Sequence, residues 1–265
     1  MPENAPLPVD SFQHSRMREA AERLLTARRT LEPIADLPAE LRPLNMEDAY
    51  LVQDTMAQAL GEIGGWKIGA PSTTATPLFG PMALLGGFAV SGTRLSRTAH
   101  RLRGLEAEIA FRLGSDLPAR STPYSRDEVV AAIASCHPAI EILESAFEDP
   151  DKVDRLSMIG DLQMNGGFAY GQAIPDWQTI DFAKVTASMI VDGAVRVEAT
   201  GSNTAGTDLV RLVVWLANEA QSRTGGLSKG DWITTGSWTG KTLVQPRSEG
   251  LARFSGCGEV AIYFE

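Results

Sequence analysis

The chain has 265 residues, of which 43% are hydrophobic, and 33 acidic against 24 basic residues give a net charge of −9. A chain of this length and composition can bury a full core, as one large domain or as a main domain with a smaller N-terminal piece. The acidic balance without a basic stripe argues against a nucleic-acid partner, and no apolar run approaches the roughly 20 residues that cross a bilayer. Because the first residues, MPENAPLPVD, also lack the pattern of a signal peptide, we expect a cytoplasmic protein without a membrane partner.

Cysteine usage agrees with that compartment. Cys136 and Cys257 are the two cysteines of the chain, lie far apart and follow no metal-ligand spacing. Such residues pack as small apolar groups in a reducing compartment. We therefore expect no structural disulfide.

Two amphipathic helices are predicted at the start of the chain and form a small N-terminal unit. Asp10 or Ser11 can cap the first helix, whose apolar residues at helical spacing are Met17, Ala20, Ala21, Leu24 and Leu25. The proline-containing stretch LEPIADLPAELRPLN breaks it. The second helix opens at Asn45, and we expect it to end at Gly64 and Gly65. Its apolar stripe consists of Ala49, Val52, Met56, Ala59, Leu60 and Ile63.

Short strands and one helix are predicted in the middle of the chain. GWKIGA (65–70) reads as a strand, PSTTATPLFGPM (71–82) as a loop, and GLEAEIAF (104–111) as a second strand. A capping box of Ser125 and Glu128 begins a helix through VVAAIAS. We expect His137-Pro138 to end that helix directly before the strand AIEIL (139–143).

The last third of the chain is predicted to be rich in strands. SMIVDGAVRV (188–197) reads as a hairpin that turns at Asp192-Gly193. An amphipathic helix then ends near Gly225-Gly226 and buries Leu209, Leu212, Val213, Leu216, Ala217 and Ala220. Three further strands are DWITTG, LARFSG and EVAIYF. Since there is no regular βαβ alternation and no glycine-rich phosphate loop, the composite is an α+β fold.

Two glutamates in GLEAEIAF can face one cation. Side chains alternate along a strand, so Glu106 and Glu108 share one face about 7 Å apart, while Leu105, Ala107 and their successors share the other. The same alternation is typical of any surface strand with one face in water. This segment alone leaves both interpretations open.

Glu141 favours the metal interpretation. Both faces of AIEIL look buried, and a lone buried carboxylate costs several kcal/mol unless it is paired. A cation held between Glu106, Glu108 and Glu141 removes that cost. Three carboxylates without a nearby His or Cys select a hard ion such as Mg²⁺ or Mn²⁺. The free coordination positions suit a 2-oxo acid, which chelates through its carboxylate and keto oxygens.

Two other segments are candidates for the same site. Lys67 lies between glycines in GWKIG, either as a strand lysine that reaches solvent or as a cation that stabilises charge or transfers a proton beside the substrate. TGSWTG (235–240) is either an ordinary glycine-containing turn between strands or a loop whose backbone N–H groups hold a carboxylate. The histidines are weaker candidates: we expect packing or capping for His137 and surface positions for His14 and His100.

The motifs taken in order resemble the fumarylacetoacetate hydrolase superfamily. They are GWKIG, GLEAEIAFRLG, HPAIEI with Ser145 four residues after its glutamate, TTGSWTG and the closing GCGEVAIYF. The likeness runs from about residue 46 to the end and is greatest to the branch of 2-keto-4-pentenoate hydratases and 4-oxalocrotonate decarboxylases. It implies a mixed β-roll or sandwich catalytic fold with a small helical N-terminal region.

The resemblance also implies roles for residues. Glu106, Glu108 and Glu141 match the ligands of Mg²⁺ or Mn²⁺, and Lys67 matches the active-site lysine. Asp161, kept in GDLQMNGGFAYG, is taken as a second catalytic residue. The remaining predicted site residues are those for substrate binding: Ser237, Thr239 and Gly240. We divide the chain into residues 1–90, a helical region and linker that includes the lysine strand, and residues 91–265, the β-rich metal-binding domain, and we expect a homo-oligomer.

The chain differs from its relatives in instructive places. It lacks the NDVS and KxxDTF segments of the carbon-carbon bond hydrolases, and four residues separate His14 from Glu19 where those enzymes have two between their His and Glu. PSTTATPLFGPM lacks the Gln and the GxDxPxxG stretch of the hydratases. Leu162 follows Asp161 where an Asn is frequent, and Trp238 is bulky for its loop.

The sequence thus predicts a lyase that adds water to a 2-hydroxy-2,4-dienoate, an unsaturated 2-oxo acid such as 2-keto-4-pentenoate, through a metal-chelated enolate. Decarboxylation of a 2-oxo diacid is the first alternative, and hydrolysis of an acylpyruvate is the second. A non-catalytic partner subunit is the alternative from another class, although the presence of all three glutamates and Lys67 argues against it.

Overall fold

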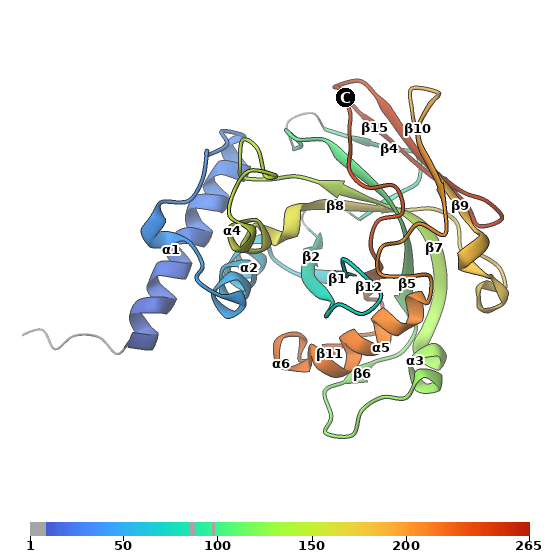
Figure 1. Ribbon diagram of the computed structural model, residues 1–265, viewed down its shortest axis with the longest axis horizontal. Helices are drawn as coiled ribbons and strands as arrows, with labels where there is room; N and C mark the ends of the chain where they lie inside the picture. The colour runs from blue at the N-terminus through green and yellow to red at the C-terminus, as the bar shows by residue number, and fades with distance from the viewer. Residues whose placement is uncertain (1–8, 85–87, 97–98) are drawn as a thin grey trace, which may run out of the picture.

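The computed structural model describes residues 9–84, 88–96 and 99–265, with side chains from residue 13 onward. A pair of long helices lies at one end of the molecule, and the rest contains two large sheets with shorter helices beside them (Figure 1). The α-helices are α1 (Val9–Thr30), α2 (Met46–Leu60), α3 (Arg126–Ala132), α4 (Arg155–Gly160), α5 (Leu209–Glu219) and α6 (Gln221–Thr224). The 3-10 helices are η1 (Ala39–Leu41), η3 (Leu162–Met164), η4 (Trp177–Thr179) and η5 (Phe182–Lys184).

The first large sheet has the order β2-β1-β12-β5-β7-β8-β3, and β13 adds to one end of β5. Neighbouring strands within this sheet pair antiparallel, except that β1 pairs parallel with β12 and β3 pairs parallel with β8. Its strands are β1 (Ile63–Gly69), β2 (Leu78–Ala83), β3 (Phe88–Val90), β5 (Gly104–Leu113), β7 (Ile133–Leu143), β8 (Asn165–Tyr170), β12 (Trp232–Thr234) and β13 (Thr242–Leu243).

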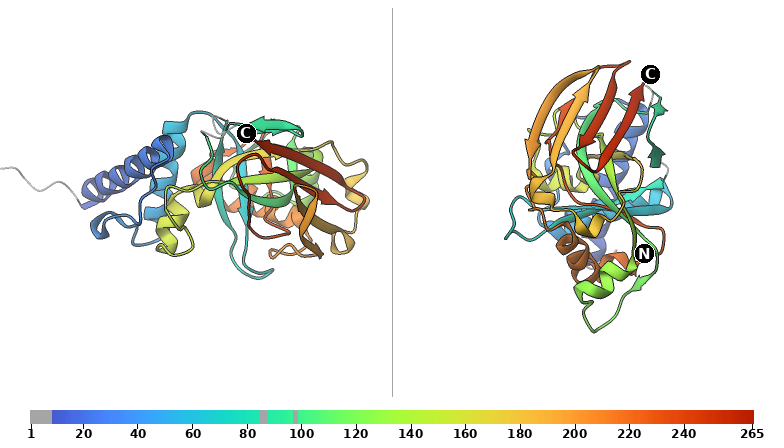
Figure 2. Two further views of the ribbon diagram at one scale, coloured as in Figure 1. Left: turned by 90° about the horizontal axis from the view of Figure 1, so that it is seen from above. Right: turned by 90° about the vertical axis from the view of Figure 1, so that its right-hand side faces the viewer.

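The second large sheet has the order β10-β9-β14-β15-β4, and β6 pairs with β11 in a small third sheet. Figure 2 shows the second sheet from two further directions as a curved layer at the other end of the molecule from α1. The strands of these two sheets are β4 (Thr93–Leu95), β6 (Leu117–Pro118), β9 (Thr186–Val191), β10 (Ala194–Thr200), β11 (Gly226–Leu227), β14 (Glu249–Phe254) and β15 (Gly258–Phe264).

The main apolar core fixes which face of β5 is left for the site. Leu105, Ile109 and Phe111 project from one face of β5 into this core, together with residues of β9, β14, β15 and α5. The sheets approach so closely there that a Cβ added to Gly250 of β14 would lie 2.2 Å from Leu105 Cδ1. Glu106 and Glu108 alternate with these residues and therefore project from the opposite face.

The helical unit has a separate apolar cluster. Met17 and Leu24 of α1 pack with Val52 and Met56 of α2, and all four side chains are fully buried. Phe147 joins this cluster from the segment after β7. The helices thus cover the end of the first sheet at which β7 stops and the following segment begins.

Most of the predicted elements are present, and the α+β class is confirmed. The hairpin of β9 and β10 turns at Asp192 and Gly193, whose φ angles are 52° and 78°. The last amphipathic helix and the three closing strands are α5, β12, β14 and β15. Both cysteines are free and buried, as expected.

Two predicted helix ends are wrong. Helix α2 ends at Leu60 with Gly61 as its cap, and Gly64 and Gly65 lie inside β1. They are glycines for a packing reason, because a Cβ at Gly65 would lie 2.1 Å from the carbonyl oxygen of Trp232. Helix α3 ends at Ala132, and the apolar run continues as the long strand β7. An apolar run of this kind fits a helix or a buried strand equally well.

Three local predictions also need correction. The loop predicted through residue 82 contains the strand β2, which pairs with β1. His137 lies within β7 and has no capping role, although its predicted packing is confirmed by a ring contact with Trp232 at 4.8 Å. His100 is buried rather than exposed and contacts Phe264 edge to face. Arg101 donates to the carbonyl oxygen of Phe147 at 2.6 Å, so this basic segment folds inward.

Candidate metal centre

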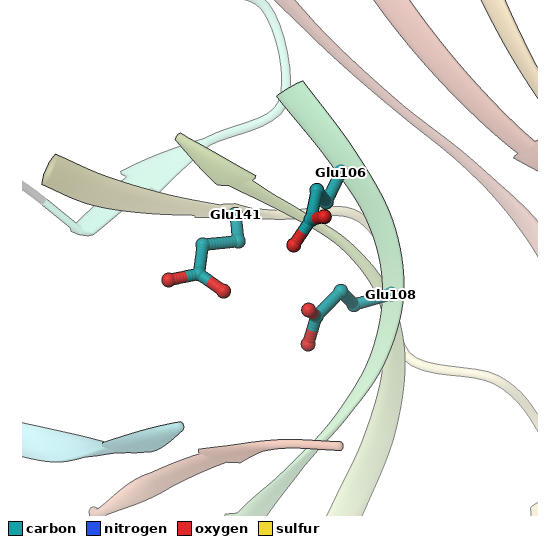
Figure 3. A group of neighbouring side chains, drawn as sticks. All are labelled: Glu106, Glu108 and Glu141. Atoms are coloured by element: carbon teal, nitrogen blue, oxygen red, sulfur yellow. The ribbon is translucent and has the colours of Figure 1, made fainter. Parts of the chain in front are cut away.

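The pairing of β5 with β7 brings three glutamates to one face of the sheet. Glu106 lies directly opposite Glu141, and Glu108 lies opposite Ala139. Since directly paired residues of an antiparallel ladder project to the same side, all three carboxylates point into one space (Figure 3). One carboxylate oxygen from each residue lies within 4.8 Å of the others. The structure therefore brings the three predicted ligands together.

Two of these carboxylates are buried, Glu106 is half-buried, and the three repel one another. Glu108 is 2% exposed, and Glu141 is fully buried. Burial, and then the neighbouring Glu141 carboxylate, raises the pKa of Glu106 to about 7. Burial and the charges of Glu141 and Glu106 raise the pKa of Glu108 well above its ordinary value. Without a cation, the cluster favours partial protonation over three full charges.

Lys67 supplies one positive charge. It projects from β1, which β12 separates from β5, and its Nζ lies 2.6 Å from Oε1 of Glu141. Nζ also donates to the backbone carbonyl oxygen of Gln163 at 2.9 Å. Burial is the largest influence on the pKa of Lys67 and lowers it, but the charges of the three glutamates, Glu141 first, leave the pKa raised. The lysine is therefore an ammonium group in this environment.

Hydrogen bonds orient two of the glutamates. Thr234 Oγ1 and the backbone N–H of Gly236, the latter at 2.9 Å, both donate to Oε2 of Glu108. Asn165 Nδ2 donates to Oε1 of Glu141 at 2.8 Å. These contacts fix the carboxylate planes, as groups around metal ligands do.

The donor set fits a hard divalent cation. Oε2 of Glu141 is buried and accepts no hydrogen bond from any residue that the structure describes, although an unpartnered buried carboxylate oxygen is costly. It belongs to the group of three carboxylates that can reach one point. An ion with oxygen ligands would satisfy this atom and relieve the repulsion between the glutamates.

A cavity of about 420 Å³ opens beside the glutamates. Ser237, one of the predicted substrate-binding residues, lines it next to Gly236, and Lys67 and the three glutamates lie in its wall. Arg155 and Lys241 add two cationic side chains to the lining, and Lys241 pairs with Asp151 at 2.5 Å. The space is large enough for a small organic acid.

Thr239 and Gly240 are not among the residues that line this cavity. The hydroxyl of Thr239 instead accepts a hydrogen bond from the backbone N–H of Ala107 at 3.2 Å, which holds the loop against β5. Trp238 is turned into the core, where it contacts Phe254 at 5.7 Å between ring centroids. Its bulk therefore does not narrow the cavity.

Asp161 does not lie with the metal cluster. It is fully buried, and its Oδ1 forms an ion pair with Arg28 Nε at 2.6 Å. Its Oδ2 accepts hydrogen bonds from Ser145 Oγ and the backbone N–H of Ala146, both at 2.8 Å. Because both oxygens are occupied outside the cavity, this position supports a positioning role rather than direct contact with a substrate.

Comparison with known proteins identifies the family. The family model described as fumarylacetoacetate (FAA) hydrolase C-terminal matches residues 70–262. The chain belongs to this family of enzymes. The matched region contains the three glutamates, and Lys67 lies just before it.

Curated relatives and solved structures agree with the family. The chain is 28% identical over 258 residues to the 2-keto-4-pentenoate hydratase of Paraburkholderia xenovorans (strain LB400), which covers 93% of this chain and 94% of the relative. The 2-keto-4-pentenoate hydratase 3 of Pseudomonas putida has the same identity and coverage. The 4-oxalocrotonate decarboxylase from Pseudomonas putida G7, complexed with magnesium and adipate, has a TM-score of 0.81 at 24% identity, covering 99% of this chain and 100% of that chain.

Wider structural similarity extends to a hydrolase. The fumarylpyruvate hydrolase from Pseudomonas aeruginosa, in complex with Mn²⁺ and pyruvate, has a TM-score of 0.56 at 15% identity and covers 76% of this chain and 88% of that chain. At that identity the likeness concerns the fold. The fold that carries the glutamate strands is therefore similar to the fold of this hydrolase.

Sequence reasoning missed several residues around the cluster. Gln163 and Asn165 contact Lys67 and Glu141, but they lie beyond helix α4, well after the end of β7, and carry no motif of their own. Arg155 begins a short helix and lines the cavity. Only the tertiary fold brings these residues to the glutamates, so no local pattern could have indicated them.

Proposed function

We propose that the protein is a metal-dependent hydro-lyase that adds water to a 2-hydroxy-2,4-dienoate, with 2-hydroxypenta-2,4-dienoate as the reference substrate. The observation that carries the proposal is the convergence of three carboxylates, two of them buried, and one lysine ammonium group in a cavity of about 420 Å³. The hydratase names of the curated relatives support the choice of reaction.

The glutamates would hold the ion and the cavity would hold the acid. A divalent cation bound by Glu106, Glu108 and Glu141 would supply Lewis acidity to the carboxylate and the 2-oxygen of the substrate. Gly236 and Ser237 line the same cavity as these glutamates and would contact the substrate carboxylate. The apolar lining residues Leu78 and Ile68 would pack against the hydrocarbon part of the substrate.

Lys67 would move the protons. In the overall reaction the enol proton leaves the 2-oxygen, a proton is added at C5, the oxygen of water is bonded to C4, and a final proton is added at C3. The ammonium group of Lys67 stabilises negative charge on the conjugated system and can return a proton to carbon. Its hydrogen bonds to Glu141 and to the Gln163 carbonyl direct it into the cavity.

The test follows the ultraviolet absorbance of 2-hydroxypenta-2,4-dienoate with Mg²⁺ or Mn²⁺ and identifies the product. We expect conversion to 4-hydroxy-2-oxopentanoate that EDTA abolishes and that Glu106→Ala lacks. Glu198→Ala, on the exposed edge strand β10, is the matched control and should retain activity. Bound metal without turnover of this dienoate would reject the reference substrate, and absence of metal binding would reject the proposal.

Decarboxylation of a 2-oxo diacid is the second candidate, and the cationic lining favours it. Arg155 lines the cavity and has no ion-pair partner among the residues that the structure describes. A guanidinium group without an acidic partner suits a second substrate carboxylate. We expect Arg155→Ala to raise KM about 10-fold for a 2-oxo diacid and to leave KM for the monoacid dienoate unchanged.

The remaining expectations belong to the same proposal. We propose Mg²⁺ or Mn²⁺ as the ion, a homo-oligomer as the assembled form and the cytoplasm as the location. No helix among the described residues is long and apolar enough to cross a membrane. The division at residue 90 also stays a prediction. The catalytic role of Asp161 is replaced in our proposal by a positioning one, and Thr239 and Gly240 are proposed to support the substrate loop.

A further inference from the structure

A left-handed turn lies directly behind the metal cluster. Leu162, Gln163 and Met164, which form η3, have φ angles of 54°, 49° and 65°. Residues other than glycine rarely adopt this conformation, because Cβ then approaches the following carbonyl oxygen. Three of them in succession persist only where the surrounding structure holds them.

The turn supplies contacts to both Lys67 and Glu141. The carbonyl oxygen of Gln163 accepts a hydrogen bond from Lys67 Nζ at 2.9 Å. Asn165, the next residue after the turn, donates from Nδ2 to Oε1 of Glu141 at 2.8 Å. Lys67 Nζ lies 2.6 Å from that same oxygen. The turn therefore fixes the lysine and the glutamate relative to each other.

Arg28 binds the turn at both ends. Its Nε donates to Oδ1 of Asp161 at 2.6 Å, and its Nη2 donates to the carbonyl oxygen of Asp161 at 2.8 Å, just before the turn. Its Nη1 donates to the carbonyl oxygen of Asn165 at 2.7 Å, just after the turn. Nη2 also reaches the carbonyl oxygen of Glu144, which follows β7, at 2.9 Å.

This arrangement requires a guanidinium group. Planar donors at fixed angles reach three carbonyl oxygens and one carboxylate at once, and a lysine ammonium group at one point cannot do so. The Arg28 side chain is 11% exposed, and its partner carboxylate is fully buried. Arg28 does not line the cavity beside the glutamates, so it acts on the site through the backbone that it holds, which is the turn and Glu144 after β7.

We propose that Arg28 is a positioning residue that clamps the left-handed turn 162–164 and thereby aligns Glu141 and Lys67 for metal binding. The proposal rests on the proposed function, because it assigns a purpose to the alignment of a metal ligand. It couples the N-terminal helix α1 to the centre of the first sheet through one side chain.

The test measures Mn²⁺ affinity of the metal-free protein by calorimetry, which does not depend on turnover. Arg28→Lys and Arg28→Ala are compared with Arg23→Ala, a control on the same helix whose ion pair is with Glu19 of that helix. We expect Kd for Mn²⁺ to rise roughly 10-fold to 100-fold in the Arg28 variants and to stay unchanged in the control. Millimolar guanidinium should restore part of the affinity of Arg28→Ala and none in Glu106→Ala.

A second variant separates clamping from general stability. Glycine adopts positive φ without strain, so Gln163→Gly added to Arg28→Lys should recover part of the lost Mn²⁺ affinity. If Arg28→Ala does not fold, Arg28→Lys alone decides. Wild-type affinity in a folded Arg28 variant, or loss of affinity that neither guanidinium nor the glycine recovers, would overturn the proposal. A wild-type chain that binds Mn²⁺ without turnover would refute the proposed function alone.

Discussion

The helical unit and the glutamate cluster contribute to the stability of the fold with opposite signs. In the helical unit, fully buried Met17, Leu24 and Met56 stabilise the fold by leaving water. In the cluster, Glu106, Glu108 and Glu141 are brought together against burial and mutual repulsion. One region stabilises the fold and the other opposes it, so mutations in the two should change different quantities.

The largest effect should come from removing one charge of the cluster. Glu108→Gln can still accept hydrogen bonds from Thr234 and Gly236, but it loses the charge that a cation needs. We expect kcat/KM to fall about 10³-fold. In EDTA, the free energy of unfolding should rise by about 1 kcal/mol or more, because repulsion is removed.

Enzyme kinetics and urea unfolding in EDTA together measure this contrast. Glu259→Gln, whose carboxylate forms an exposed ion pair in the second sheet, is the control and should change neither quantity appreciably. Simultaneous loss of activity and stability in Glu108→Gln would contradict the view that the cluster opposes folding.

A mutation in the helical unit should lower stability and leave metal affinity unchanged. Met17→Ala leaves a cavity between α1 and α2 and should lower the free energy of unfolding by about 2–5 kcal/mol. The Kd for Mn²⁺ of the folded protein should stay unchanged, because Met17 belongs to the apolar cluster of the helical unit and does not line the cavity beside the glutamates. Leu44→Ala, at a side chain that is 69% exposed, is the matched control and should be close to neutral.

The smallest effect is expected in the pH dependence of the free energy of unfolding. The pKa of Glu106 is raised from its ordinary 4.5 to about 7 in the fold. The folded state therefore holds a proton that the unfolded state has lost between these values, so stability falls as pH rises from about 4.5 to 7. Relative to Glu106→Gln in EDTA, the wild type should lose on the order of 2 kcal/mol across that window.

Chemical unfolding at several pH values checks the sign. If the wild type instead gained stability relative to Glu106→Gln as the pH rose from about 4.5 to 7, the assigned cause would be contradicted. Saturating Mn²⁺ should remove or reverse the dependence, because the ion binds the ionised carboxylate and not the acid.

The three glutamates could be predicted because their signal is local. Alternation along β5 and β7 fixes which residues share a face, and pairing of the two strands then places Glu106 opposite Glu141. The α+β class and the hairpin at Asp192-Gly193 follow from equally local patterns.

The support around the cluster could not be predicted because it depends on distant contacts. Leu162, Gln163 and Met164 give no sign of positive φ, since glycine or asparagine is the usual marker of that conformation. Arg28 and Asp161 meet across 133 residues. The burial of His100 in a basic segment likewise depends on carbonyl groups of the segment after β7, which receive Arg101.

The position of β12 between β1 and β5 has a consequence for synthesis of the protein. Lys67 leaves the ribosome early, and the strand that joins its own strand to that of Glu106 ends only at Thr234. A nascent chain that has not reached this residue has no strand between β1 and β5 and no donor from Thr234 to Glu108. Because contacts of long sequence separation form late, the surroundings of the glutamate cluster are complete only in a chain whose synthesis is nearly finished.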